Sequence, residues 1–236
     1  MENHYIGTEL ELFQQATNWK QYWMQAISPY IGVNLLEVGA GIGANTGILL
    51  SKFDFIETIK CVEPDPLLST QIQNNISENL RPKCSVHTGF SSEIEPTELF
   101  DTILYIDVIE HIENDRLELE NVKNLLKPNG HLIVLVPAYQ YLFSEFDKAI
   151  GHYRRYNKSM LRFSAQTELV EKRMFYLDSV GFFASLMNKH LLNQKHPTKD
   201  QILLWDKVMV PSSKIFDTLI GRSFGKSLIG IWQRPF

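Results

Sequence analysis

Residues 34–45 carry the stretch that decides the fold: Asn-Leu-Leu-Glu-Val-Gly-Ala-Gly-Ile-Gly-Ala-Asn. An apolar, strand-like run leads straight into three alternating glycines, and a helical pattern begins at about Asn45. A glycine loop between a strand and a helix lets a ligand approach the backbone closely, near the unpaired N–H groups of the helix N-terminus. The stretch therefore predicts a site for a polar, nucleoside-like ligand.

The chain around this loop alternates between short apolar runs and helical patterns. An amphipathic helix is expected over 8–28, followed by strands over 34–38, 58–62, 84–87, 102–106 and 131–136 and helices over 45–52, 66–80 and 115–126. Beyond Pro137 the pattern loosens, then predicts a helix over 159–169, a strand over 172–177, two helices within 179–220 and a last strand over 227–233. This alternation is typical of an α/β fold with a doubly wound parallel sheet.

Composition limits the class of protein. With 236 residues, 44% of them hydrophobic and only two cysteines, the chain is neither disordered nor a disulfide scaffold. No apolar run approaches the roughly 20 residues of a membrane span. We expect one domain over 1–236, with a helical cap over 1–30, a ligand-binding core over 33–136 and substrate-side loops, helices and last strands over 137–236. The N-terminal residues do not resemble a signal peptide, so we expect a cytoplasmic protein with Cys61 and Cys84 as free thiols.

Charge is divided unevenly along the chain. Residues 1–186 hold 15 Lys and Arg against 24 Asp and Glu, whereas residues 187–236 hold 8 against 3. The acidic body argues against nucleic-acid binding. The cationic, apolar region 187–236 predicts peripheral contact with a membrane or with a lipid-linked or phosphate-bearing substrate. The alternative is a helix pair with ordinary solvated lysines.

A carboxylate follows the glycine loop at a sequence spacing that is typical of nucleoside-binding sites. Glu63 ends the second strand, 22 residues after Gly41, where it can accept hydrogen bonds from ribose hydroxyls. Gly39, Gly41 and Ala44 also fit the dinucleotide pattern G-x-G-x-x-A, which would indicate an NAD-dependent oxidoreductase. Against that alternative stand Glu37, which precedes the loop where dinucleotide sites have an apolar residue, the extra Gly43, and the run Asp107-Val108-Ile109-Glu110-His111 after the fourth strand.

With these motifs, residues 33–136 resemble the class I S-adenosylmethionine-dependent methyltransferases. The resemblance implies strand order 3-2-1-4-5-7-6 with strand 7 antiparallel, and Cys61 and Cys84 on neighbouring strands, unpaired. It implies S-adenosylmethionine as cofactor, bound by Glu37, Gly39, Ala40, Gly41, Gly43, Glu63, Pro64, Phe90, Ser91 and Asp107. The family often has an acidic residue near the adenine, but this chain reads Gly89-Phe90-Ser91-Ser92. Phe90 either covers the adenine ring or is a core residue at a strand end.

Two histidines are candidates for a general base. His111 follows the fourth strand, at the edge of the sheet where parallel sheets bind ligands, and His152 follows the fifth. The alternative for His111 is a packed residue at a helix start. Asp107, Glu110 and His111 also offer oxygen and nitrogen ligands for a divalent metal, and a similar run in ubiquinone-biosynthesis O-methyltransferases is associated with metal. We expect a mechanism without metal.

A dense run of directional donors lies further along the chain, at Gly151-His152-Tyr153-Arg154-Arg155-Tyr156. Its two guanidinium groups and two phenols predict a substrate clamp, which we assign to Tyr139, Tyr153, Arg154, Arg155 and Tyr156. The alternative is a turn whose arginines pair with Glu145 and Asp147 and whose Asn157 caps the next helix.

The predicted function is S-adenosylmethionine-dependent O-methylation of a small molecule, a sugar or a lipid-linked glycan. The glycan acceptor follows from a looser resemblance of 131–161 and of short segments near 187 and 224 to small bacterial methyltransferases associated with surface-polysaccharide glycosyltransferases. The alternatives are the NAD-dependent oxidoreductase and a noncatalytic interaction module with the same fold.

Overall fold

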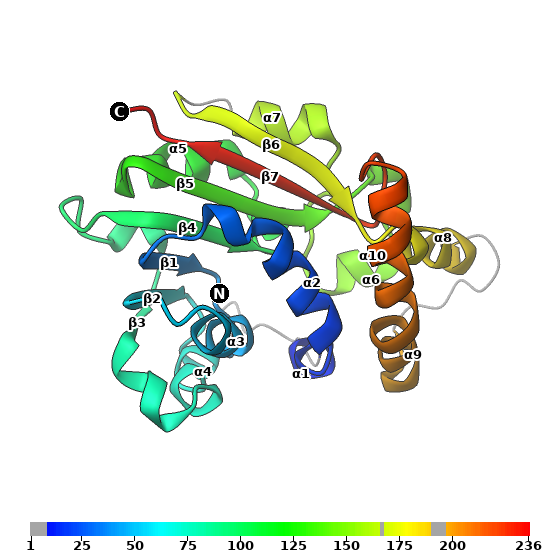
Figure 1. The fold of residues 1–236 in the computed structure, drawn as a ribbon, viewed down its shortest axis with the longest axis horizontal. Helices are drawn as coiled ribbons and strands as arrows, with labels where there is room; N and C mark the ends of the chain where they lie inside the picture. Colours follow the sequence, from blue (N-terminus) through cyan, green and yellow to red (C-terminus); the bar gives the residue numbers. More distant parts are fainter. Residues whose placement is uncertain (1–8, 166–167, 190–196) are drawn as a thin grey trace.

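The computed structural model describes residues 9–165, 168–189 and 197–236. A seven-stranded sheet runs through the centre, in the order β3-β2-β1-β4-β5-β7-β6 (Figure 1). The strands are β1 Asn34–Val38, β2 Thr58–Glu63, β3 Cys84–Thr88, β4 Phe100–Ile106, β5 Leu126–Pro137, β6 Val170–Leu177 and β7 Ser227–Gln233. The first five are parallel, and β7 is antiparallel to both β5 and β6. The predicted strand order and the direction of the last strand are confirmed.

Helices cover both faces of this sheet. The α-helices are α1 Glu9–Gln14, α2 Thr17–Ile27, α3 Ala44–Lys52, α4 Pro66–Ser69, α5 Asp115–Val122, α6 Glu145–Ala149, α7 Lys158–Ser164, α8 Ser179–Met187, α9 Lys199–Leu204 and α10 Val210–Leu219. Figure 1 shows α2, α3 and α10 on one side of the sheet and α5 and α7 on the other. Each face of the sheet has its own hydrophobic core. Because successive side chains of a strand point to opposite faces, Leu35 packs in the core beneath α2, α3 and α10, and Leu36 packs in the core beneath α5 and α7.

Two predicted helices are wrong in their extent. The helix expected over 8–28 is interrupted, since the backbone N–H of Thr17 turns back to the carbonyl of Gln15 and separates α1 from α2. Residue 8 lies outside the described residues. The helix expected over 66–80 ends at Ser69, and short 3₁₀ turns follow.

A tertiary contact explains the second error. The Asn75 side chain donates to the carbonyl of Ile42 at 2.7 Å, and Ile72 is buried directly beneath Gly43. Both contacts draw the segment against the glycine loop and override its helical pattern.

The end of the chain agrees with the expected elements. Of the helices predicted within 179–220, the first is α8, and the second runs from α9 through a π turn at Trp205–Met209 into α10. A third predicted helix is wrong in its extent, since the helix expected over 159–169 is α7, which ends at Ser164. Cys61 and Cys84 lie on neighbouring strands as free thiols, as expected, with their sulfur atoms 3.8 Å apart, within hydrogen-bond distance. Within the described ranges, no helix has the length and apolar character needed to cross a membrane.

Candidate active site

The glycine loop joins β1 to α3 in a conformation that needs glycine. Gly39 and Gly43 have φ angles of +68° and +78°, in the left-handed region. A Cβ on Gly39 would lie 2.5 Å from the Val108 side chain, so the β4 loop packs directly against it. The N–H groups of Gly39 and Ala40 donate to the carbonyl of Val62 and tie the loop to the end of β2. The loop is therefore rigidly held with its outer side available to a ligand.

A cavity of about 620 Å³ opens beside this loop. Its wall combines Gly39–Ile42 of the loop, Asp107 after β4, and side chains from α2, α8 and α9. The volume is that of a small-molecule site, which typically measures ~300–1,000 Å³. Its position at the carboxyl ends of β1 and β4 is the point where the strand order reverses, the usual ligand position in such sheets.

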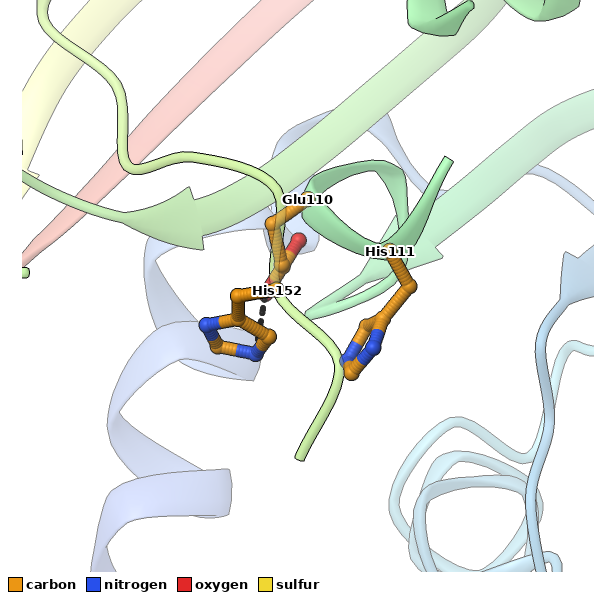
Figure 2. A group of neighbouring side chains, drawn as sticks. All are labelled: Glu110, His111 and His152. Carbon is orange, nitrogen blue, oxygen red and sulfur yellow. Dashed lines mark ion pairs between the residues drawn. The ribbon is translucent and has the colours of Figure 1, made fainter. Parts of the chain in front are cut away.

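Three titratable side chains gather at the floor of the cavity: Glu110, His111 and His152 (Figure 2). One ligand atom from each lies within 4.8 Å of the others. Glu110 has no exposed surface, and neither of its carboxylate oxygens has a hydrogen-bond partner among the described residues. Its Oε1 lies 3.9 Å from Nε2 of His152, the contact that is dashed in Figure 2. Burial, together with the charge of Asp107, holds the pKa of Glu110 well above its usual range.

His152 is oriented by a buried carboxylate. Its Nδ1 lies 2.9 Å from Oδ1 of Asp147, and Asp147 also accepts hydrogen bonds from Nε and Nη2 of Arg155 at 2.8 and 2.9 Å. Burial opposes ionisation of Asp147, but hydrogen bonds from His152 and the charge of Arg155 hold its pKa well below the usual range. An ionised carboxylate only accepts hydrogen bonds, so Nδ1 of His152 must carry the proton. In neutral His152, Nε2 is therefore the acceptor nitrogen.

His111 lies against His152, with ring centroids 4.5 Å apart and planes nearly perpendicular. Burial and the neighbouring His152 lower the pKa of His111 to about 4, although a hydrogen bond with the backbone of Ile150 opposes the shift. His111 is therefore neutral near pH 7, and its ring packs edge-on against the ring of His152.

The same three residues form a donor set suited to a divalent cation. Two imidazoles and one carboxylate are the ligands of many catalytic zinc sites, and the Asp147 hydrogen bond to His152 is a typical outer-shell contact. The structure thus differs from the predicted metal set of Asp107, Glu110 and His111, because it replaces Asp107 by His152.

Asp107 is accessible from the cavity, and the low solvation there raises its pKa to about 6, opposed by the charge of His152.

The predicted cofactor residues fall into two groups. Gly39, Ala40, Gly41 and Asp107 line the cavity. The remaining six, namely Glu37, Gly43, Glu63, Pro64, Phe90 and Ser91, are not among the described residues of its wall.

Glu37 and Glu63 support the loop from below. Glu37 is buried and accepts a 2.6 Å hydrogen bond from the Thr46 hydroxyl in the first turn of α3. Burial raises the pKa of Glu37 to about 7. Glu63 accepts from the backbone N–H groups of Gly41 at 2.8 Å and Asp65 at 3.0 Å. Each Glu63 oxygen keeps a second lone pair, so a contact with ribose stays compatible with this geometry.

The segment after β3 presents Phe90 and hides Ser91. Phe90 is 62% exposed, which excludes the alternative of a core phenylalanine and leaves its ring available to a ligand. The Ser91 hydroxyl is buried and donates to Glu118, which also accepts from the Tyr105 hydroxyl. Pro64 is exposed at the end of β2.

The predicted substrate clamp is not assembled as expected. Arg154 pairs with Asp115 at 2.9 Å, and the buried Tyr156 hydroxyl donates to the same carboxylate at 2.6 Å. Tyr153 is exposed beside Arg154. The reason is that Asp115 and Asp147, each in the first turn of a helix, take up one arginine each.

Tyr139 and Arg155 of the predicted clamp, and the helix cap of the alternative, lie in three different environments. Tyr139 stacks on Tyr176, with centroids 5.1 Å apart, in an aromatic cluster. Asn157 caps α7 through the N–H of Met160, as the alternative anticipated. Of the clamp residues, Arg155 is the one described in the cavity wall, and its buried Nη1 has no hydrogen-bond partner among the described residues.

Some contacts and residues of the cavity were missed in the sequence. The alternative to the clamp named Asp147 as an arginine partner, and this is confirmed for Arg155. The capping box Ser144-x-x-Asp147 predicts a helix start, but it does not predict a partner for His152. Lys20 of α2 is buried in the wall, and burial lowers its pKa to about 8 against the opposing charge of Asp206. Lys226 also lines the cavity, with Nζ 4.6 Å from the Trp205 ring centroid. No sequence pattern indicated either lysine.

The sheet order, the glycine loop and the cavity at the strand ends define a class I methyltransferase fold. A family described as a methyltransferase domain matches residues 11–187, and the chain belongs to that family. Membership identifies residues 11–187 as an S-adenosylmethionine-dependent methyltransferase domain, and it decides against the NAD-dependent oxidoreductase fold for this domain. The chain spans about a third of the length of the curated relative it matches, 36%.

Individual similarities are more distant. The mitochondrial ubiquinone biosynthesis O-methyltransferase of Dictyostelium discoideum is 26% identical over 118 residues, which span 45% of this chain and 36% of that enzyme. Phosphoethanolamine N-methyltransferase 2 of Haemonchus contortus, solved with phosphomonomethylethanolamine and S-adenosylhomocysteine, has a TM-score of 0.65 and 15% identity over 99% of this chain and 58% of that one. The [4+2]-cyclase SpnF has a TM-score of 0.62 at 15% identity, over 99% and 86%. These structures share the fold with this chain.

Proposed function

We propose that this methyltransferase transfers a methyl group to an oxygen nucleophile, with His152 as the general base. The observation that carries the proposal is the 2.9 Å contact between His152 and Asp147 inside the cavity. Asp147 holds the proton on Nδ1, so Nε2, which lies 3.9 Å from Oε1 of Glu110, would accept a proton from a hydroxyl bound beside it in the cavity.

The cofactor would be held mainly by the glycine loop. Gly39, Ala40 and Gly41 would contact its amino-acid portion in the cavity, with Asp107 nearby. Glu63 would accept from the ribose hydroxyls, and the exposed Phe90 ring would cover the adenine. When bound, S-adenosylmethionine supplies a methyl group activated by its sulfonium charge.

The reaction is an in-line displacement, so the protein aligns the groups and excludes water. With the cofactor bound, the acceptor oxygen would form a bond to the methyl carbon as the carbon–sulfur bond breaks, and the electron pair of that bond would stay on sulfur. The hydroxyl proton passes to Nε2 of His152 and later to solvent. Asp147 stabilises the resulting imidazolium, and Arg155 keeps Asp147 ionised and in place.

The cavity also supports an acceptor with an oxygen-rich group on an apolar body. Arg155 offers one buried Nη1 to a hydroxyl, carboxylate or phosphate oxygen. Other parts of the wall are apolar, since α2 contributes Trp19 and Trp23 and α9 contributes Leu204. A small phenol or enol, a sugar or a lipid-linked glycan combines these properties.

The cluster of Glu110, His111 and His152 favours a second mechanism for the same function. If a divalent cation occupied it, His152 would be a metal ligand and the metal would bind the acceptor oxygen. Activity that survives complete metal removal with a chelator excludes this alternative. Activity that is lost and then restored by added Zn²⁺ or Mg²⁺ excludes the metal-free base.

The proposal is tested with S-adenosylmethionine labelled in its methyl group and a panel of hydroxyl acceptors. His152→Gln should lower kcat by about 10²–10⁴, the usual contribution of a positioned base. S-adenosylhomocysteine affinity should stay unchanged. The matched control is His131→Gln, because His131 lies on β5 against Tyr30 and outside the described cavity wall. Full activity of His152→Gln would refute the base, and cofactor binding with no methylated product in any panel would favour the noncatalytic module.

A further inference from the structure

An exposed apolar stripe follows the long helical segment near the end of the chain. Leu204, Val208, Ile215 and Leu219 are spaced four, seven and four residues apart, so they share one helix face, and Phe216 adjoins them. Their exposed fractions are 53, 54, 65 and 75%, with 53% for Phe216. We call these five residues the α9–α10 face. Large apolar side chains gathered on a surface usually mark a binding site for a protein or a membrane.

The charges around this face are predominantly positive. Lys199 and Lys207 are exposed, and Lys214 is half-buried with Nζ 5.6 Å from the Tyr22 ring centroid. Asp200, in the first turn of α9 and one helical turn before Leu204, is the exposed acidic residue within 199–219, so two exposed lysines stand against one exposed carboxylate.

The other two acidic residues of this segment point into the protein. Asp206 is buried and accepts hydrogen bonds from Asn18 and from the backbone N–H of Trp19. Asp217 is buried and accepts from the Tyr22 hydroxyl and from the backbone N–H of Asp178. Both carboxylates thus fasten α9 and α10 to the body of the enzyme, and the lysines determine the charge that the surface presents.

This combination selects the partner. A symmetric dimer through the α9–α10 face would bury the apolar side chains but would gain nothing from the excess of exposed lysines beside them. An anionic bilayer accepts apolar side chains at its interface and attracts lysines at the same time. The described helices do not span a bilayer, so the contact is peripheral.

We propose that the α9–α10 face docks the enzyme on the surface of an anionic lipid bilayer. Docking on a bilayer would bring the cavity close to acceptors in the membrane, an inference that rests on the proposed function. Met187 and Leu204 are 57% and 53% exposed, yet both also line the cavity, so the cavity reaches the surface beside the face. An amphiphilic acceptor could leave the bilayer there with its polar group directed toward His152.

Sedimentation with vesicles tests the docking without requiring methyl transfer. The full chain is mixed with vesicles of phosphatidylcholine alone or of phosphatidylcholine and phosphatidylglycerol at three to one, at low and high salt. We expect binding to the anionic vesicles, weakened by salt. Lys199→Gln and Lys207→Gln should each lower the partition coefficient about fivefold. Ile215→Asp combined with Leu219→Asp should lower it more than about tenfold.

A matched control keeps the outcome specific. Leu117→Asp changes a leucine of similar exposure, 54%, on α5 and should leave vesicle binding unchanged. All variants should keep the circular dichroism spectrum and the S-adenosylhomocysteine affinity of the unmodified chain. The proposal is overturned if the unmodified chain does not bind anionic vesicles, or if the Ile215 and Leu219 changes leave binding intact. It is also overturned if the unmodified chain does not bind vesicles but forms a dimer in sedimentation velocity, and Ile215→Asp with Leu219→Asp abolishes that dimer.

Discussion

The substitution Glu37→Gln distinguishes two roles for Glu37, which either supports the glycine loop from inside the protein or contacts the cofactor directly. In the structure, Glu37 lies under the loop and accepts a hydrogen bond from Thr46 at 2.6 Å. Glutamine has nearly the same shape and keeps an oxygen that can accept this bond, but it cannot ionise. The variant therefore removes the buried charge with little change in packing.

The magnitude follows from the pKa of this carboxyl group. Burial raises it from 4.5 to about 7 in the folded protein, opposed by Thr46 and Lys20. Between these two values the unfolded chain releases the proton while the folded protein keeps it, so stability falls as the pH rises. At 1.36 kcal/mol per pKa unit, the free energy of unfolding should decrease by about 3 kcal/mol across this window and stay level above it. Glu37→Gln should abolish this decrease.

Urea unfolding at about pH 5 and about pH 8 measures the effect. Because part of the decrease has already occurred at pH 5, we expect the stability of Glu37→Gln relative to the unmodified chain to rise by about 2.5 kcal/mol between the two conditions. Glu57→Gln, at an exposed position, should show no such rise. Parallel pH dependence in the unmodified chain and Glu37→Gln would refute the argument. S-adenosylhomocysteine affinity near pH 7 should be unchanged, and a large loss would instead place Glu37 in contact with the cofactor.

Other predictions concern the remaining site residues. Glu63→Ala should weaken S-adenosylhomocysteine binding by about 1–3 kcal/mol, measured by calorimetry, because ribose and the Gly41 N–H both lose a charged acceptor; unchanged affinity would remove the ribose role. Asp147→Asn should lower kcat by about 10²–10⁴, because the favoured tautomer of His152 changes. The same variant should lose roughly 3–5 kcal/mol of stability in urea, because the Arg155 charge is left uncompensated. Arg155→Lys should raise the acceptor KM through loss of the bidentate group and Nη1, whereas Arg154→Ala should leave it unchanged; the reverse result would restore the original clamp.

Local pattern was sufficient for the sheet and for the loop. The apolar runs, the glycines at 39, 41 and 43 and the carboxylate at Glu63 depend on backbone geometry and on short sequence distances, so they could be recognised one segment at a time. The 3-2-1-4-5-7-6 order followed from the resemblance that these motifs carry. By contrast, the helix expected over 66–80 was wrong because Asn75 and Ile72 respond to the glycine loop, some thirty residues away.

The identity of the chemical groups in the site was decided by tertiary structure. The sequence contained His111, His152 and two adjacent arginines, but their roles depend on which carboxylate each one meets. Asp147 meets His152 and Arg155, and Asp115 removes Arg154 from the cavity. A buried ion pair forms where the fold brings opposite charges together out of water, and residue spacing does not specify that position. The same reason applies to the charge of the α9–α10 face, because Asp206 and Asp217 point into the protein while Lys199 and Lys207 stay exposed.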